Sequence, residues 1–301
     1  MTGGTAHADK YFDSDGGQDF IEIPGRPRSR VKRLWAPRSL QDMAADIDDM
    51  YWAGTYGQSI KITRVGQGKT RRWLVSIPGT QHFDTPSTPN PADTEANIRE
   101  ALGMPSSMRA GIILALHQAM SEEGVDPEGF ATEPVMLAGH SQGGLIAVNL
   151  GSLSAQETGI DVRAILAMGA PARRTRIRPE VVMVDIAHDQ DVVPSTDGTP
   201  ARAPDHRIMV GRKLIQPRQR ALYYAHSSST YTETVGHLER RSAITQWDRV
   251  GQAVRSLQAM LPQGDEPTRV RIYDVWQELD DPNSGVWSRV KGIHARQLTC
   301  N

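Results

Sequence analysis

The stretch 134–150, PVMLAGHSQGGLIAVNL, constrains the fold of this 301-residue chain more than any other feature. Four apolar residues lead directly into GHSQGG at 139–144, and apolar residues with helical spacing follow. This order predicts a strand, a tight turn and a helix. A serine at the apex of such a turn needs unusual backbone angles, and side chains at Gly139 and Gly143 would collide with the strand and the helix. We therefore expect a sharp elbow with Ser141 at its apex.

An elbow of this kind suits acyl-transfer chemistry. The Ser141 hydroxyl would stand above the carboxyl edge of a sheet, where it can attack a carbonyl carbon. The amide of Gln142, at the start of the following helix, would point toward the position of a developing oxyanion. The alternative is an ordinary glycine-rich turn with a solvated serine.

A second glycine-containing turn precedes this unit. Two β-like runs, 60–65 and 71–77, are separated by GQGK and predict a hairpin. The second run ends in PGTQ, and in serine hydrolases with such an elbow the loop after the preceding strand supplies a second oxyanion amide. Gly79 and Thr80 fit that role. The alternative is a plain turn at the end of a strand.

The segments around the elbow predict an α/β fold. Residues 106–123 carry apolar side chains every four residues, which predicts a helix between the run 71–77 and the strand of the elbow. A strand–helix–strand unit implies parallel strands. Further strands are expected at 164–168 and 181–186.

A carboxylate partner is expected on a loop after a strand downstream of the elbow. The run HDQDVVP follows the predicted strand 181–186 and contains Asp189 and Asp191. Asp191 is favoured because it lies in the loop and precedes Val-Val-Pro, which could anchor it against the sheet. Asp185, inside the apolar run, and Asp189 are its rivals, and a solvated loop aspartate is the alternative.

An imidazole base is expected after the acid in chain order. His226 follows the run LYYA and precedes SSST, residues suited to capping a helix. Its rival, His237, lies inside a helical run at 231–241, where a surface histidine is the simpler interpretation. We therefore expect His226 to be the base.

Composition and charge argue against several classes of function. The 34 basic and 35 acidic residues give a net charge of −1, so no global field attracts nucleic acid or an anionic membrane. The single cysteine, Cys300, excludes an internal disulfide and suits a reducing compartment. No secretory signal is visible, and no apolar run approaches the roughly 20 residues that span a bilayer. We expect a cytoplasmic protein without an integral membrane segment, and export by a route without such a signal stays open.

We expect one domain over residues 37–301, which includes a C-terminal extension, and an N-terminal arm before it. Residues 1–36 are polar and rich in Gly, Asp and Arg, which predicts a flexible N-terminal arm. Apolar stripes predict packing helices at 39–51 and 242–261. The tail contains a strand-like run at 269–275 without a chemical motif, and we expect it to form a C-terminal extension.

Four segments of the chain share a pattern with known proteins. They are IPGTQ at 77–81, GHSQGG at 139–144, DVVP at 191–194 and the H-x-x-x-x-Y from His226 to Tyr231. Together they resemble the α/β-hydrolase superfamily, in particular class 3 type lipases and related bacterial esterase-like domains. The resemblance implies an α/β-hydrolase fold, with a mostly parallel central sheet and helices on both faces.

The resemblance also implies a serine-dependent carboxylic ester hydrolase that needs no metal and no organic cofactor. Its substrate would be a small-molecule ester or acyl compound. One departure is that the segment 195–220 is basic, where a lipase acting on fat droplets would carry a hydrophobic lid. The implied roles are nucleophile for Ser141, acid for Asp191, base for His226, and oxyanion donors for Gln142, Gly79 and Thr80.

Other functions stay open from the sequence alone. The same three residues could serve an acyltransferase or a thioesterase, and the fold could belong to a binding protein without turnover. Imidazole and carboxylate groups could also hold a metal ion, although no helical ligand pair is present. Loops at 82–90 and 195–220 would set specificity, so the sequence fixes neither the substrate nor the oligomeric state. The metal hypothesis concerns His188, Asp189, Asp191 and His226.

Overall fold

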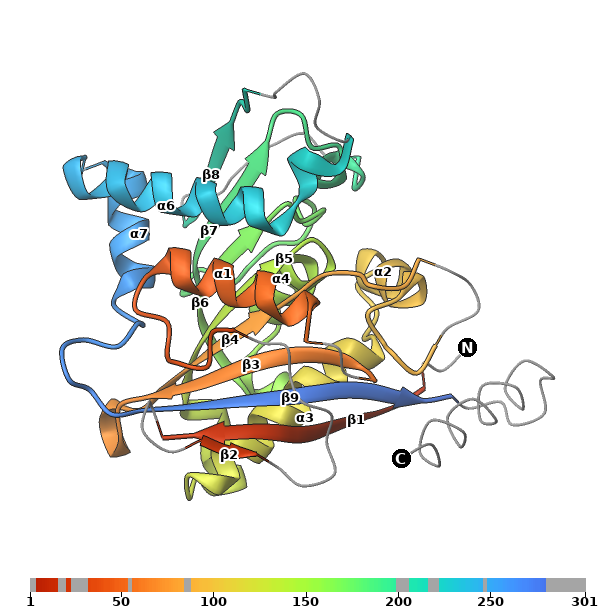
Figure 1. Cartoon of the computed structure of the whole chain (residues 1–301), viewed down its shortest axis with the longest axis vertical. Helices are drawn as coiled ribbons and strands as arrows, with labels where there is room; N and C mark the ends of the chain where they lie inside the picture. Colours follow the sequence, from red (N-terminus) through yellow and green to blue (C-terminus); the bar gives the residue numbers. More distant parts are fainter. Residues whose placement is uncertain are drawn as a thin grey trace.

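The computed structural model describes residues 4–15, 20–22, 32–53, 56–83, 88–198, 206–215, 222–245 and 248–279. In this part of the chain one nine-stranded sheet forms the centre, with the strand order β2-β1-β9-β3-β4-β5-β6-β7-β8 (Figure 1). The strands are β1 (Thr5–Ser14), β2 (Phe20–Glu22), β3 (Gln58–Val65), β4 (Arg72–Ile77), β5 (Pro134–His140), β6 (Asp161–Met168), β7 (Val182–His188), β8 (Arg207–Arg212) and β9 (Thr268–Glu278).

The sheet has a parallel half and an antiparallel half. Strands β4 to β8 pair in parallel, each with the next along the chain. Strands β3 and β4 form the predicted antiparallel hairpin, and β9 pairs antiparallel with both β3 and β1. The α/β class is therefore confirmed, and the parallel strands expected around the elbow lie in the half that carries the candidate site.

Helices cover both faces of the sheet. On one face α1, α6 and α7 pack against strand residues such as Leu74 and Met136, and on the other α3 and α4 pack against Trp73 and Val135. Neighbouring strand residues point to opposite faces, so central strands such as β4 and β5 contribute to two cores. The helices are α1 (Leu40–Tyr51), α2 (Thr94–Ala101), α3 (Ser107–Glu122), α4 (Gln142–Ser152), α5 (Ala155–Thr158), α6 (Ser228–Ile244) and α7 (Arg249–Gln258).

The two ends of the chain differ from the prediction. Of the expected flexible arm, 1–36, residues Thr5–Ser14 form strand β1, because Tyr11 and Phe12 are buried against Ile272 of β9 and its neighbours. The expected C-terminal extension contains β9, which lies between β1 and β3 inside the sheet (Figure 1). Strands β1 and β9, from opposite ends of the chain, therefore belong to the sheet of the domain.

The prediction of one long helix at 242–261 is also wrong. Helix α6 ends at Ile244, and α7 begins at Arg249 after Asp248, whose carboxylate accepts a hydrogen bond from the Gly251 amide at 2.6 Å. Asp248 satisfies an otherwise free amide at the start of a helix, which favours a new helix at this point. Trp247 and Cys300 lie outside the described residues. Among the described helices, none is long and apolar enough to cross a membrane.

Candidate active site

The turn between β5 and α4 is a strained elbow with Ser141 at its apex. Ser141 has φ 55° and ψ −121°, and in the described part of the chain it alone among non-glycine residues has a positive φ. A Cβ atom at Gly139 would lie 2.3 Å from the Gly143 backbone, and one at Gly143 would lie 2.4 Å from the Ile77 carbonyl oxygen. Both glycines are therefore required by close packing, as the sequence predicted.

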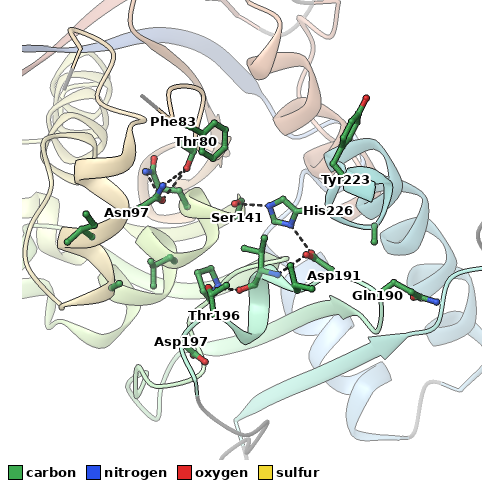
Figure 2. Close-up of a pocket in the computed structure, with 18 residues that line it drawn as sticks. Thr80, Phe83, Asn97, Ser141, Gln190, Asp191, Thr196, Asp197, Tyr223 and His226 are labelled. Atoms are coloured by element: carbon green, nitrogen blue, oxygen red, sulfur yellow. Dashed lines mark hydrogen bonds and ion pairs between the residues drawn. The ribbon is translucent and has the colours of Figure 1, made fainter. Parts of the chain in front are cut away.

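Three side chains far apart in the sequence form a continuous hydrogen-bonded chain at this elbow. The Ser141 Oγ lies 2.9 Å from Nε2 of His226, and Nδ1 of His226 lies 2.7 Å from Oδ2 of Asp191 (Figure 2). A carboxylate can only accept, so Nδ1 of a neutral His226 carries the proton and Nε2 accepts from the serine hydroxyl. This is the arrangement in which an imidazole can take a proton from serine.

Asp191 is held by groups from two elements. It lies in the turn after β7, where its Oδ1 accepts from the Val193 amide at 3.0 Å, and its Oδ2 also accepts from the Tyr231 hydroxyl of α6 at 2.7 Å. Burial alone would raise the pKa of Asp191, but the hydrogen bond and charge of His226 and the bond from Tyr231 together lower this pKa from its ordinary value. The carboxylate is therefore ionised and fixed at neutral pH.

The other candidates for the acid and the base lie outside this hydrogen-bonded chain. Asp185 is buried in β7 and forms an ion pair with Arg207 at 2.8 Å. Asp189 is exposed, and His237 is exposed on α6, where its Nδ1 accepts from Arg240 at 3.1 Å. The geometry thus brings together the favoured residues Ser141, Asp191 and His226.

The predicted oxyanion donors separate into two groups. Gln142 is the first residue of α4, and Thr80 follows β4. Both residues line the cavity beside Ser141, and neither backbone N–H has a hydrogen-bond partner in the described residues. The backbone amide of Gly79, the third predicted donor, instead donates to the Tyr51 hydroxyl at 2.6 Å and is therefore occupied in this structure. Gly79 is needed for space, because a Cβ there would lie 2.7 Å from the Ser141 Cβ.

Asn97 of α2 connects the two candidate donor segments. Its Oδ1 accepts from the Gln142 side chain at 2.9 Å, and its Nδ2 donates to the Thr80 hydroxyl at 2.9 Å (Figure 2). The Gln142 side chain also donates to the Asp93 carbonyl at 2.9 Å. The start of α4 and the turn after β4 are therefore held at a fixed separation.

A cavity of about 830 Å³ opens above these residues. Phe83 and Tyr223 lie on either side of Ser141 and His226 in Figure 2, and their side chains are about three-quarters exposed. Among the residues that the structure describes, neither arginine nor lysine lines the cavity. The described lining residues are Thr80, Phe83, Asn97, Ile98, Ala101, Ser141, Gln142, Leu145, Pro171, Gln190, Asp191, Val192, Val193, Thr196, Asp197, Tyr223, Ala225 and His226.

The basic segment 195–220 contributes little charge to this cavity in its described part. Arg207 is buried against Asp185, and Arg212 donates to the Thr234 hydroxyl at 2.7 Å. Other arginines of the segment, Arg202, Arg218 and Arg220, lie outside the described residues.

The hypothesis of a metal site has no geometric support among the residues described. His188 is turned away from the carboxylates, because its Nδ1 bonds to the Ala225 carbonyl at 2.6 Å and its Nε2 to the Thr234 hydroxyl at 2.8 Å. No group of three histidine, cysteine, aspartate or glutamate side chains in the described ranges could hold an ion.

Sequence reasoning missed the residues that support the site. Asn97 and Tyr51 come from helices distant in sequence from the elbow, and no motif marks either of them. Tyr231 belongs to the quoted H-x-x-x-x-Y pattern, which placed it five residues after His226 without assigning it a role. The spacing from His226 was the signal that could have identified Tyr231, because a hydroxyl in the first turn of α6 can reach the Asp191 carboxylate.

Comparison with known proteins adds no identification. No protein-family model matches the chain, and no curated protein matches it in sequence. The function is therefore argued from the geometry of the site.

Proposed function

We propose that this protein is a serine-dependent carboxylic ester hydrolase on an α/β-hydrolase fold, acting through an acyl-enzyme intermediate. The observation that carries the proposal is the continuous chain from Ser141 through His226 to Asp191, with bonds of 2.9 and 2.7 Å. The three groups occur in the chain order serine, acid, histidine, which suits a nucleophile on a strand–turn–helix elbow.

The reaction begins when the Ser141 oxygen attacks the ester carbonyl carbon and His226 takes the hydroxyl proton at Nε2. Asp191 keeps the other nitrogen of His226 protonated and stabilises the imidazolium that forms. The tetrahedral intermediate then expels the alcohol, which receives the proton from His226. A water molecule, activated by the same imidazole, hydrolyses the acyl-enzyme and restores the serine.

Negative charge on the intermediate requires donors that are in place beforehand. The amides of Thr80 and Gln142 fit this role, because both residues line the cavity with Ser141 and both amides are free of other partners in the described chain. The N-terminus of α4 adds its dipole at the same point. Each such donor contributes on the order of 3 kcal/mol to transition-state stabilisation in comparable sites.

The cavity also limits the substrate class. Its described lining is rich in apolar side chains, among them Ile98, Leu145 and Val192, and the carboxylates of Asp191 and Asp197 are the charged groups in that described part. Burying an anionic group there would cost free energy without a compensating cation. The preferred substrate is therefore an ester with an uncharged, apolar acyl group.

A series of p-nitrophenyl esters with acyl chains of two to twelve carbons tests the proposal. The wild type should hydrolyse them, whereas Ser141→Ala and His226→Ala should each lose activity by at least about a thousandfold. His237→Ala is the matched control and should keep wild-type activity. A folded wild type that hydrolyses none of the esters, or a Ser141→Ala variant as active as the wild type, would overturn the proposal.

The same series distinguishes hydrolysis from acyl transfer. With a competing alcohol present, free acid should remain the main product if water is the natural acceptor. Predominant formation of the new ester would identify the protein as an acyltransferase that uses the same residues.

A further inference from the structure

Tyr51, the last residue of α1, connects the two backbone segments that flank the candidate oxyanion position. Its hydroxyl accepts from the Gly79 amide at 2.6 Å and lies 2.7 Å from Nδ1 of His140. Its own carbonyl accepts from the Gln81 side chain at 2.9 Å. One end of α1 thus contacts both the turn 78–81, which contains Thr80, and the residue directly before Ser141.

The direction of the two hydroxyl bonds follows from the atoms involved. An amide N–H can only donate, so the Tyr51 oxygen is the acceptor toward Gly79 and its one proton is available for His140. His140 therefore accepts at Nδ1 and carries its own proton at Nε2. Burial, with the nearby His226 charge as a smaller cause, lowers the pKa of His140 to about 3, and burial raises the pKa of Tyr51. Both groups are neutral in the working pH range, as this bond requires.

We propose that Tyr51 is a positioning residue that fixes the turn 78–81 against the elbow, so that the Thr80 and Gln142 amides converge on one oxyanion. The inference rests on the proposed ester hydrolysis and adds a specific residue to it. Tyr51 does not line the cavity, so it acts through Gly79 and His140 and not by touching substrate.

Close packing at this point explains why the Tyr51 hydroxyl can control the position of the turn 78–81. A Cβ at Gly79 would lie 2.5 Å from the Tyr51 oxygen and 2.9 Å from the His140 carbonyl oxygen, so turn and elbow are already in near contact. Removing the hydroxyl leaves the Gly79 amide and the His140 Nδ1 without partners at a buried place. The turn must then shift to find new partners, and Thr80 moves with it.

The test compares Tyr51→Phe with Tyr11→Phe. Tyr11 supplies a matched control, because its hydroxyl also forms a buried bond, 2.8 Å to Ser59 Oγ, on strand β1 away from the cavity. The rate of covalent labelling by a fluorophosphonate is the main readout, since this reaction needs the oxyanion donors but no knowledge of the natural substrate. The kcat and KM for a p-nitrophenyl ester are measured alongside, with all proteins well below their unfolding temperatures.

For Tyr51→Phe we expect labelling and kcat to fall by roughly 10- to 100-fold with KM little changed, because only the transition state uses the misplaced donor. Tyr11→Phe should lose thermal stability and keep both rates. Wild-type rates in Tyr51→Phe, or an equal loss of rate in Tyr11→Phe, would overturn the inference. A wild type that is neither labelled nor active would instead refute the proposed function itself.

A second pair of variants keeps the test decisive if Tyr51→Phe folds poorly. His140→Asn retains an acceptor for the Tyr51 proton near the place of Nδ1, whereas His140→Leu removes it. The leucine variant should label at least several-fold more slowly than the asparagine variant. Equal labelling rates in the two variants would contradict the positioning role.

Discussion

Two buried aspartates near the site differ in their partners, and this difference decides their roles. Asp191 bonds to His226 and Tyr231, which leaves its charge facing the imidazole. Asp185 is buried within strand β7 and neutralises Arg207, which is almost fully buried. The first residue is therefore expected to affect catalysis, and the second to affect folding.

Substitution by asparagine separates the two roles. Asp191→Asn should lower kcat by roughly 10⁴-fold, because an amide no longer fixes the required imidazole tautomer. Asp185→Asn should keep the kcat of the folded protein but reduce the free energy of unfolding by about 3 to 5 kcal/mol, because it leaves the Arg207 charge unpaired. Urea unfolding and ester hydrolysis on both variants check this. The reverse pattern would exchange the roles of the two residues.

The pKa of His140 gives a pH dependence of stability. Its folded-state pKa is about 3, below the ordinary value of 6.5, so between these values the unfolded chain binds a proton that the folded protein excludes. Stability from this residue is therefore complete above pH 6.5 and is lost as the pH falls toward 3.

From pH 7.5 to 5 this loss should amount to roughly 2 kcal/mol. His140→Asn removes the titrating group, so the drop in its free energy of unfolding over the same range should be smaller by that amount. Urea titrations of both proteins at the two pH values provide the measurement. Identical pH dependence in the two proteins would show that His140 is not held neutral.

At the scale of elements, the site lies where the backbones of β4, β5 and α4 pack closely against one another. Gly79 ends up within contact of the elbow, although it is far from Ser141 in sequence. Adding one methyl group at this point should separate the turn 78–81 from the elbow. The consequence should be a loss of oxyanion stabilisation.

Gly79→Ala should therefore reduce kcat by about 100-fold or more. Gly211→Ala on β8 is the control, because the added Cβ there would meet nothing closer than the Asp189 carboxylate at 3.7 Å. Steady-state ester hydrolysis by both variants measures the effect. Full activity of Gly79→Ala would mean that the turn can move without harm to the site.

Local sequence patterns predicted the elements around the site well. The elbow, the hairpin before it and the strand before Asp191 each follow from an apolar run that ends at glycine or at polar loop residues. The contribution of Tyr51 was not predictable, because nothing in the stripe of α1 indicates that its last residue reaches Gly79 and His140. The hydrogen bond that occupies the Gly79 amide was not predictable for the same reason, since its partner, Tyr51, comes from a remote helix.

At the scale of the whole molecule, the sheet depends on both ends of the chain. β9 pairs with β3 on one side and with β1 on the other, so residues near 10 and near 270 share a ladder. Composition suggested a polar arm and a tail because β1 mixes polar and apolar residues, and its partner lies more than 250 residues away. Pairing at such a distance leaves no local signal in the sequence.

A chain that ends at Glu266, and so lacks β9, should fail to fold. Both β1 and β3 would lose the neighbour that joins them in the sheet, and Glu123 would lose its ion pairs with Arg269 and Arg271 and keep only the one with Arg64 among the described residues. Circular dichroism and gel filtration should show an unfolded or aggregated product. A monomeric, cooperatively unfolding product would contradict the place of β9 inside the sheet.

The central claim is that Ser141 is a nucleophile activated by His226 and Asp191. Reaction of the intact folded protein with a fluorophosphonate, followed by peptide mass spectrometry, tests it most directly. We predict a single adduct on Ser141 in the folded wild type, no adduct in Ser141→Ala, and loss of the reaction when the wild type is unfolded in urea. A folded wild type that stays unmodified at Ser141 under these conditions would contradict the account.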